Sequence, residues 1–201
     1  MGRKKIRVND LNGMLSRHIR TKTVERLKDL KEKGRDDVCV LFCWLDCCET
    51  LRIELRYKTE SDFRRTSREI DDPREARWFC SCVYAEARRP YSFGEEDEHL
   101  VPMAANFDVM SEEERADLAD ENADLDPVVC CNLKRALCET IQKLHEFGVS
   151  TGVFGREIPV VFYDEIEESD YCRGNLKLNM KANGNYLPKE VVKFYREILG
   201  E

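Results

Sequence analysis

The sequence predicts a single α+β domain in which a small, mostly antiparallel sheet is packed with helices. Helical periodicity near both ends and in the middle alternates with short segments that have the pattern of strands. The 201 residues, 42 % of them hydrophobic, are enough to form one core. No repeat or linker divides the chain, so we expect residues 1–201 to form one domain.

The first predicted element is a helix over residues 9–33. Asn9 or Asp10 caps it, apolar residues recur at intervals of three and four, and Gly34 ends it. His18 lies on the apolar stripe, where a buried structural histidine is favoured over a catalytic one. Residues 1–36 hold 12 basic and 5 acidic side chains, a net charge of +7, so this is a basic N-terminal helix.

A hairpin is predicted next. Residues 38–45 are almost entirely apolar, residues 46–49 read as a turn, and residues 50–57 alternate between apolar and charged side chains. This alternation predicts an antiparallel hairpin whose charged face, with Arg52, Glu54 and Arg56, is exposed to solvent. Thr59 then caps a helix, with Asp62 at the spacing of a capping box.

The rest of the chain is predicted to contain two strands, three helices and the turns and loops that connect them. A strand over 77–85 is followed by a helix from Ser111 to about Asn122 and a longer one from Asp126 to Gly148. Residues 152–156 form a turn, residues 158–163 a strand, residues 165–175 a polar loop, and a last helix starts at Pro188.

The ten cysteines are expected to be free core thiols. The chain begins without a secretory signal, which argues for a cytoplasmic location and against a disulfide framework. No C-x2-C pair is present, so no metal site is predicted; zinc held by distant pairs is the alternative. The longest apolar stretch is too short to span a membrane.

Two short motifs are candidate ligand sites. Arg77 and Trp78 together have the chemistry of a clamp for a carboxylate or phosphate, but a tryptophan that anchors a helix to the sheet, with Arg77 as its polar neighbour, is the favoured interpretation. The segment from Gly152 to Arg156 has glycines that allow a phosphate cradle, but it lacks the lysine of a P-loop and favours a turn. Acidic residues 164–170 follow a strand and favour a solvated loop over a cation site.

Residues 93–126 are a candidate protein-binding surface. They hold 13 acidic side chains and one basic side chain, a net charge of −12. Such a segment would attract a basic protein, with Glu95, Glu96, Asp97 and Glu98 as its densest part. The alternatives are mimicry of nucleic acid and a solvated loop and helix face with a merely solubilising role, which is the usual explanation of such a charge run. The overall charge of −7 argues against binding to nucleic acid or anionic membranes.

Several of these segments together resemble a bacterial domain-of-unknown-function family, number 4303. The resemblance rests on the hairpin 38–57 with the helix start 59–63, on residues 75–78, on the helix 133–144, and on residues 148, 154–156, 160–163 and 178–179. Residues 79–83 depart from the family pattern, which has a second tryptophan and a proline there. The resemblance implies the fold and a bacterial origin, but no established activity.

We therefore expect a non-enzymatic binding or regulatory protein, by analogy an immunity-type partner of a basic protein. No catalytic constellation is visible in the sequence, and no cofactor is expected. The alternatives are an acidic nucleic-acid mimic, or a small hydrolase or ligand-binding enzyme with an Arg/carboxylate pocket. The enzyme alternative would require carboxylates such as Glu54 and Asp164 to lie close together in the fold.

Overall fold

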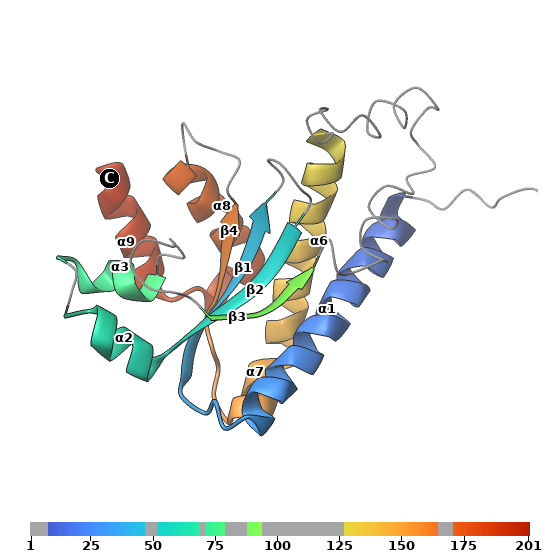
Figure 1. The fold of residues 1–201 in the computed structure, drawn as a ribbon. Coiled ribbons are helices and arrows are strands. Elements are labelled where there is room, and N and C mark those ends of the chain that lie inside the picture. The colour runs from blue at the N-terminus through green and yellow to red at the C-terminus, as the bar shows by residue number, and fades with distance from the viewer. Residues whose placement is uncertain (1–7, 47–51, 69–70, 79–87, 94–126, 165–170) are drawn as a thin grey trace, which may run out of the picture.

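The computed structural model describes residues 8–46, 52–68, 71–78, 88–93, 127–164 and 171–201 (Figure 1). The elements of the first half are α1 (Val8–Glu32), β1 (Val38–Asp46), β2 (Arg52–Thr59), α2 (Glu60–Thr66), α3 (Pro73–Trp78) and β3 (Arg88–Phe93). Those of the second half are α6 (Pro127–Glu146), α7 (Val149–Phe154), β4 (Val160–Asp164), α8 (Tyr171–Asn183), the 3-10 turn η1 (Gly184–Tyr186) and α9 (Lys189–Leu199).

The described strands form one four-stranded sheet in the order β3-β2-β1-β4. The β1–β2 and β2–β3 pairs are antiparallel, and β4 lies parallel to β1 at the other edge. The predicted α+β class, with a small and mostly antiparallel sheet packed with helices, is therefore confirmed. A parallel neighbour for β1 requires a long crossover, which α6 and α7 supply between β3 and β4.

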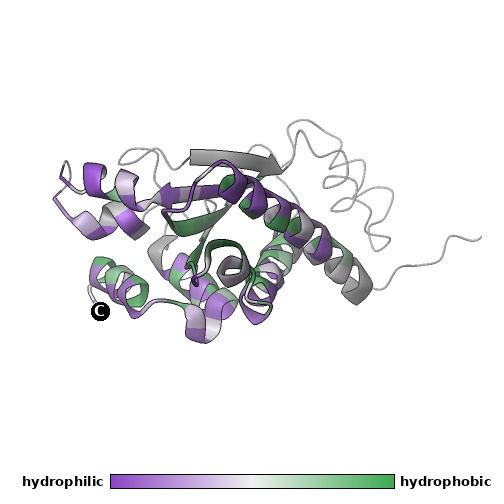
Figure 2. Ribbon diagram, turned by 90° about the horizontal axis from the view of Figure 1, so that it is seen from below, coloured by the Kyte–Doolittle hydropathy of each residue, from purple (hydrophilic) through white to green (hydrophobic). Residues whose placement is uncertain are grey.

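Helices lie on both sides of the sheet. Figure 1 shows α1 and α6 on one side and α2, α3 and α9 on the other. In Figure 2, α1 and α9 carry alternating bands of hydrophobic and hydrophilic residues, as expected for helices with one face against a core. The sheet is thus the middle of three layers, and both of its faces are covered.

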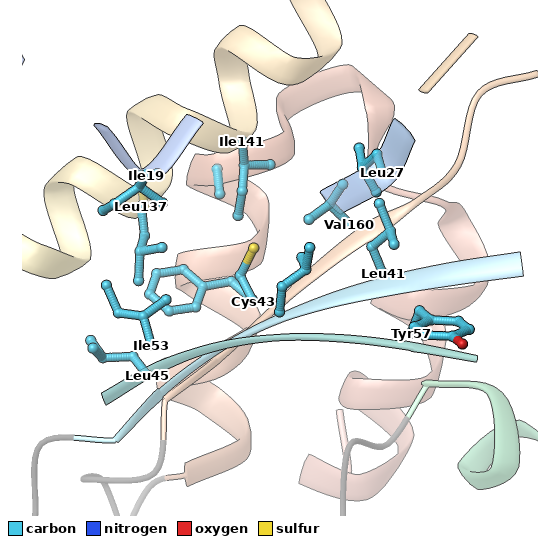
Figure 3. Packing of buried hydrophobic residues seen from close by; sticks show 14 of the residues in the cluster. Ile19, Leu27, Leu41, Cys43, Leu45, Ile53, Tyr57, Leu137, Ile141 and Val160 are labelled. Carbon is cyan, nitrogen blue, oxygen red and sulfur yellow. The ribbon is translucent and has the colours of Figure 1, made fainter. Parts of the chain in front are cut away.

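The larger core lies between the sheet and the helices α1, α6 and α7. Figure 3 shows Ile19 of α1 and Leu137 and Ile141 of α6 packed above Cys43 of β1 and Ile53 of β2. All five side chains are buried. The helical repeats predicted for residues 9–33 and 126–148 therefore correspond to the apolar faces of α1 and α6. Both helices pack with these faces against the same side of the sheet.

The smaller core lies on the opposite face of the sheet. Phe42 of β1 and Val161 of β4 pack there with Trp78 of α3 and with Val191 and Phe194 of α9. This cluster explains why residues 38–45 show no polar alternation, since β1 has apolar neighbours on both faces.

The edge of β4 is covered by asparagine side chains of α8. Asn179 accepts a hydrogen bond from the backbone N–H of Phe162 (2.7 Å) and donates one to its carbonyl (2.6 Å). Asn175 bonds the N–H and carbonyl of Asp164 in the same way, at 2.8 and 3.1 Å. These amides form the hydrogen bonds to the backbone of β4 that a fifth strand would otherwise form.

The predicted helix start at Thr59 is confirmed in detail. The hydroxyl of Thr59 accepts from the N–H of Asp62 (3.0 Å) and donates to its carboxylate (2.7 Å). The helices predicted to end at Gly34 and Gly148 also do so, because both glycines adopt the left-handed conformation at φ 70° and 56°.

Four sequence predictions were wrong. The charged face of the hairpin is not exposed, because Glu54 and Arg56 are each only 2 % accessible. The strand predicted over 77–85 is not among these four, because residues 79–85 lie outside the described residues; positions 77 and 78 end helix α3. Residues 149–154 form helix α7, where the sequence predicted no helix and a turn over residues 152–156. The polar loop predicted over residues 165–175 is wrong from Tyr171 onwards, where helix α8 begins. His18 is half-buried and not fully buried.

Candidate functional site

A row of three charged side chains lies inside the smaller core. Glu54, Arg56 and Lys58 alternate along β2, so all three project from the same face of the strand. Each is only 2 % accessible to solvent. Ionised side chains are costly to bury unless they are paired, and for that reason they gather at functional sites as well as in structural networks.

Aromatic rings of the neighbouring strands hold this row in place. The Arg56 guanidinium donates from Nε to the Glu54 carboxylate at 2.5 Å and lies over the Trp44 ring, with Cζ 3.1 Å from the ring centroid. Trp44 packs edge-to-face against Tyr163 of β4. The Arg56–Glu54 pair is therefore fixed by stacking as well as by charge.

The row ends at the start of β1, where a basic cluster forms around Cys39. We use this name for Lys58 of β2, Arg77 of α3 and Arg156 of the segment between α7 and β4. Burial, and then the Glu60 carboxylate, raise the pKa of the Cys39 thiol to about 11, and the three cations lower it by less. Among the described groups that act on Cys39, three are therefore cations and one is a carboxylate.

A β-bulge sets the geometry of this cluster. Val38 pairs with Thr59 and Val40 with Lys58, so Cys39 is the extra residue in β1. The bulge lets both Cys39 and Val40 face the smaller core. Bulges re-aim side chains and are common next to binding sites.

Each cation is placed by a local feature of its own segment. Thr59 ends β2 directly after Lys58 and caps α2, whose first residue is Glu60. Gly155 ends α7 in the left-handed conformation at φ 72°, and the next residue, Arg156, donates from Nη2 to the carbonyl of Val38 at 2.6 Å. Helix α3 brings Arg77 to Glu60, with Nη2 at 3.1 and 3.0 Å from the two carboxylate oxygens.

The residues predicted as a ligand site thus lie at one end of the sheet. Arg77 and Arg156, 79 positions apart in the sequence, both lower the pKa of the Cys39 thiol, and Arg156 also bonds the carbonyl of Val38, the residue before Cys39. Trp78 is buried in the smaller core, in the same cluster as Cys39, which suits the anchoring interpretation as well as a wall behind a ligand. Lys58, Cys39 and Glu60 were missed; the bulge and the buried strand face that place them leave no signature in the sequence.

The two carboxylates considered for an enzyme do not converge. Glu54 pairs with Trp44 and projects to the smaller core, whereas Asp164 pairs with Leu45 and projects to the larger one. There the Asp164 carboxylate meets the Lys134 ammonium of α6 at 2.5 Å. A shared site for both carboxylates, as the hydrolase alternative required, is therefore absent from this part of the fold.

The described thiols do not have the character of nucleophiles. Burial raises the pKa of the Cys138 thiol to about 11, with smaller effects of Lys181 and Glu139, and Cys39 reaches the same value. Thiols in that range stay protonated near neutral pH. Cys43 is also buried, and all three are free cysteines. These positions agree with the prediction of core thiols.

His145 is engaged by structural partners at both ring nitrogens. Nδ1 lies 2.5 Å from a carboxylate oxygen of Glu157, and Nε2 lies 2.9 Å from the side-chain oxygen of Asn183. Tyr186 stacks on the ring at 4.6 Å. The imidazole joins α6 to α8 and to the segment before β4, so it acts as a structural bridge here.

Three further features of the described residues were considered as candidate sites or membrane segments, and none indicates one. No group of three or more metal-ligating side chains occurs among the described residues. A shallow surface hollow is lined by Lys189, Val192, Lys193, Arg196, Glu197 and Glu201, all from α9 and the C-terminus, and mixed charges make it a poor site for an ion of either sign. Within the described residues, no helix is long and apolar enough to cross a bilayer.

The acidic segment 93–126 lies outside the described residues, except for its first residue. The protein-binding role predicted for Glu95, Glu96, Asp97 and Glu98 consequently stays a prediction. Searches against family models, curated proteins and solved structures found no match. The resemblance to family 4303 and the bacterial origin stay predictions as well.

Proposed function

We propose that this chain is a non-enzymatic binding protein that holds an anionic group at the basic cluster of Lys58, Arg77 and Arg156. One observation carries the proposal: Arg156 donates to the carbonyl of Val38 beside Cys39, Lys58 pairs with Val40 on its other side, and Arg77 is held by Glu60, two residues after Lys58. Like charges gathered from distant parts of a chain repel one another, so such an arrangement favours an anion at its centre.

The accessibility of the cluster also supports binding. The Arg77 side chain is 28 % exposed and Arg156 lies at the surface, so a ligand can reach their guanidinium groups. Lys58 is buried, so its positive charge acts on a bound anion through space and not by direct contact. Arginines at the rim supply directed hydrogen bonds to carboxylate or phosphate oxygens, which is the usual chemistry of anion recognition.

Thermal unfolding in the presence of simple anions tests this function. We expect sodium phosphate, pyrophosphate, propionate or citrate, at an ionic strength matched with sodium chloride, to raise the Tm of the wild-type protein. At 100 times its dissociation constant a ligand stabilises the folded state by about 2.7 kcal/mol, which is roughly 5–10 °C for a chain of this size.

Arg156→Gln should remove most of this shift, measured against the variant's own Tm without ligand. Arg173→Gln is the matched control, because Arg173 pairs with Glu201 at the C-terminus and lies away from the cluster. The proposal is wrong if none of the four anions exceeds the sodium chloride control, or if both variants respond like the wild type.

A further inference from the structure

The His145 ring meets an oxygen atom at each of its two nitrogens. Nδ1 lies 2.5 Å from Oε1 of Glu157, and Nε2 lies 2.9 Å from Oδ1 of Asn183. The orientation of the Asn183 amide follows from its other end, because Nδ2 donates at 3.1 Å to the carbonyl of Asn179, which can only accept. The oxygen of Asn183 therefore faces His145, and Nε2 must carry a hydrogen to donate to it.

The contact with Glu157 then requires a second hydrogen on the ring. A neutral imidazole carries one hydrogen, and the bond to Asn183 uses it. Without a second hydrogen, the lone pair of Nδ1 would face the Glu157 carboxylate, so two acceptors would meet at 2.5 Å. A proton on Nδ1 turns this conflict into a charge-assisted hydrogen bond. The contacts around His145 are thus those of an imidazolium ring.

The surroundings of the ring also favour a positive charge. The His145 side chain is only 2 % exposed and lies against the Glu157 carboxylate, whose other oxygen accepts a hydrogen bond from the Thr151 hydroxyl at 3.0 Å. Tyr186 of η1 stacks on the ring with the two centroids 4.6 Å apart, and the face of an aromatic ring attracts a cation. Its phenol is the titratable group that η1 presents, whereas α8 contributes the neutral amide of Asn183.

Other charged groups near this end of α6 have partners of their own. Lys143 and Glu146 pair with each other at 2.6 Å on the surface of α6. The Arg20 guanidinium of α1 lies over an aromatic ring just after the end of α6. Within the described part of the chain, the Glu157 carboxylate is therefore the charged group that contacts His145.

We propose that His145 and Glu157 form a proton-dependent bridge, closed while the ring carries both hydrogens and weakened when the hydrogen on Nδ1 leaves as a proton to solvent. The bridge joins the end of α6 to the segment between α7 and β4, so its loss loosens that segment. Because closure requires a proton that the open state does not, acid favours closure and a rising pH weakens it. Imidazole side chains ordinarily change charge between about pH 5 and 8. This inference is independent of the proposed function.

Amide hydrogen exchange of Ile158 between pH 5.5 and 8.5 tests the bridge. Its N–H donates to Oγ of Ser150 at 3.2 Å and lies next to Glu157 in the loosened segment. After correction for the intrinsic pH dependence of exchange, protection in the wild type should fall about tenfold or more towards pH 8.5, because one linked proton changes an equilibrium up to tenfold per pH unit. NMR of the His145 ring should show loss of the hydrogen on Nδ1 over the same pH interval.

Glu157→Gln is the variant that separates a proton-dependent bridge from a merely structural one. The new amide group can donate to a bare Nδ1 while its oxygen still accepts from Thr151, so the bridge no longer needs a second proton. Protection of Ile158 should then change by less than about threefold over the same range. Glu146→Gln is the matched control, because it removes an exposed carboxylate on α6 that pairs with Lys143 and not with the ring. This control should keep the wild-type pH profile.

A second variant keeps the test valid if Glu157→Gln does not fold. His145→Gln removes the titrating ring, so Ile158 protection should become nearly independent of pH. The other two histidines of the chain titrate in every variant, and differences between the variants therefore report on the bridge. A flat profile in the wild type, or the wild-type profile in both bridge variants, overturns the inference. So does loss of the ring hydrogen without a change in protection, or an equal effect of Glu146→Gln, which would indicate a general effect of charge.

Discussion

At the scale of single residues, the most consequential feature is the ion pair of Glu54 and Arg56 inside the smaller core. Its charges lose hydration on folding, and their attraction and the stacking on Trp44 must offset that loss. Breaking such a pair is more harmful than replacing it, since removal of one partner leaves the other charge buried. The same logic separates the interior pairs of this protein from its surface pairs.

We expect Glu54→Leu to lower the free energy of unfolding by about 3–5 kcal/mol, measured by urea unfolding at 25 °C. The double variant Glu54→Leu/Arg56→Met should regain a large part of that loss, because no uncompensated charge remains. For comparison, Glu146→Gln at the exposed pair with Lys143 should cost no more than about 1 kcal/mol. If the double variant is as unstable as the sum of its single changes, the pair is not coupled as described.

At the scale of elements, helix α8 completes the sheet with side chains instead of a strand. Asn175, Asn179 and Asn183 recur every four residues, so they lie along one face of the helix. The first two bond the backbone of β4, and the third bonds His145 and the carbonyl of Asn179. One helix thereby closes the exposed edge of the sheet and joins it to the end of α6.

Asn179→Ala should destabilise the fold by about 2–4 kcal/mol, because it leaves the buried N–H and carbonyl of Phe162 without their side-chain partner. Hydrogen exchange of the Phe162 amide should become faster than in the wild type. Asn183→Ala is the matched control, since it removes an equally buried amide that has no contact with β4 in the hydrogen bonds described. Equal protection of Phe162 in both variants would show that the asparagine contacts do not secure the edge.

At the scale of the whole molecule, the central strand β1 ties the two cores together. Its side chains alternate between them, with Leu41, Cys43 and Leu45 in the larger and Val40 and Phe42 in the smaller core. Neither helical layer can separate from the sheet without exposing one face of β1. The described part of the chain should therefore unfold as one cooperative unit.

Coincident unfolding curves test this cooperativity. Tryptophan fluorescence reports on Trp44 and Trp78, which lie on the side of the smaller core, whereas far-UV circular dichroism is dominated by the long helices α1 and α6 on the other side. We expect the two signals to give the same urea midpoint and the same slope within error. Separate midpoints would mean that the two layers fold independently.

Local features of the sequence were sufficient to predict much of this fold. The repeats of α1, α6 and α9, the strand pattern of β1 and the Thr59 cap are all encoded by residues a few positions apart, so they can be recognised without knowledge of distant contacts. The α+β class follows from the order of these segments. The ligand-binding role predicted for Arg77 and Arg156 stays a prediction, and no local pattern in the sequence relates one residue to the other.

Tertiary structure alone decided the rest, because the relevant partners are far apart in the chain. The alternation in β2 shows that one face of the strand is apolar, and from this pattern the charged face was predicted to be exposed to solvent. The charged face is buried instead, because Trp44 and other residues outside β2 supply partners for Glu54 and Arg56. The opposite directions of Glu54 and Asp164 depend on the register of β1 with β2 and β4. The places of Lys58 and Arg156 on either side of Cys39 likewise depend on the bulge in β1 and on the end of α7, which are distant in the sequence.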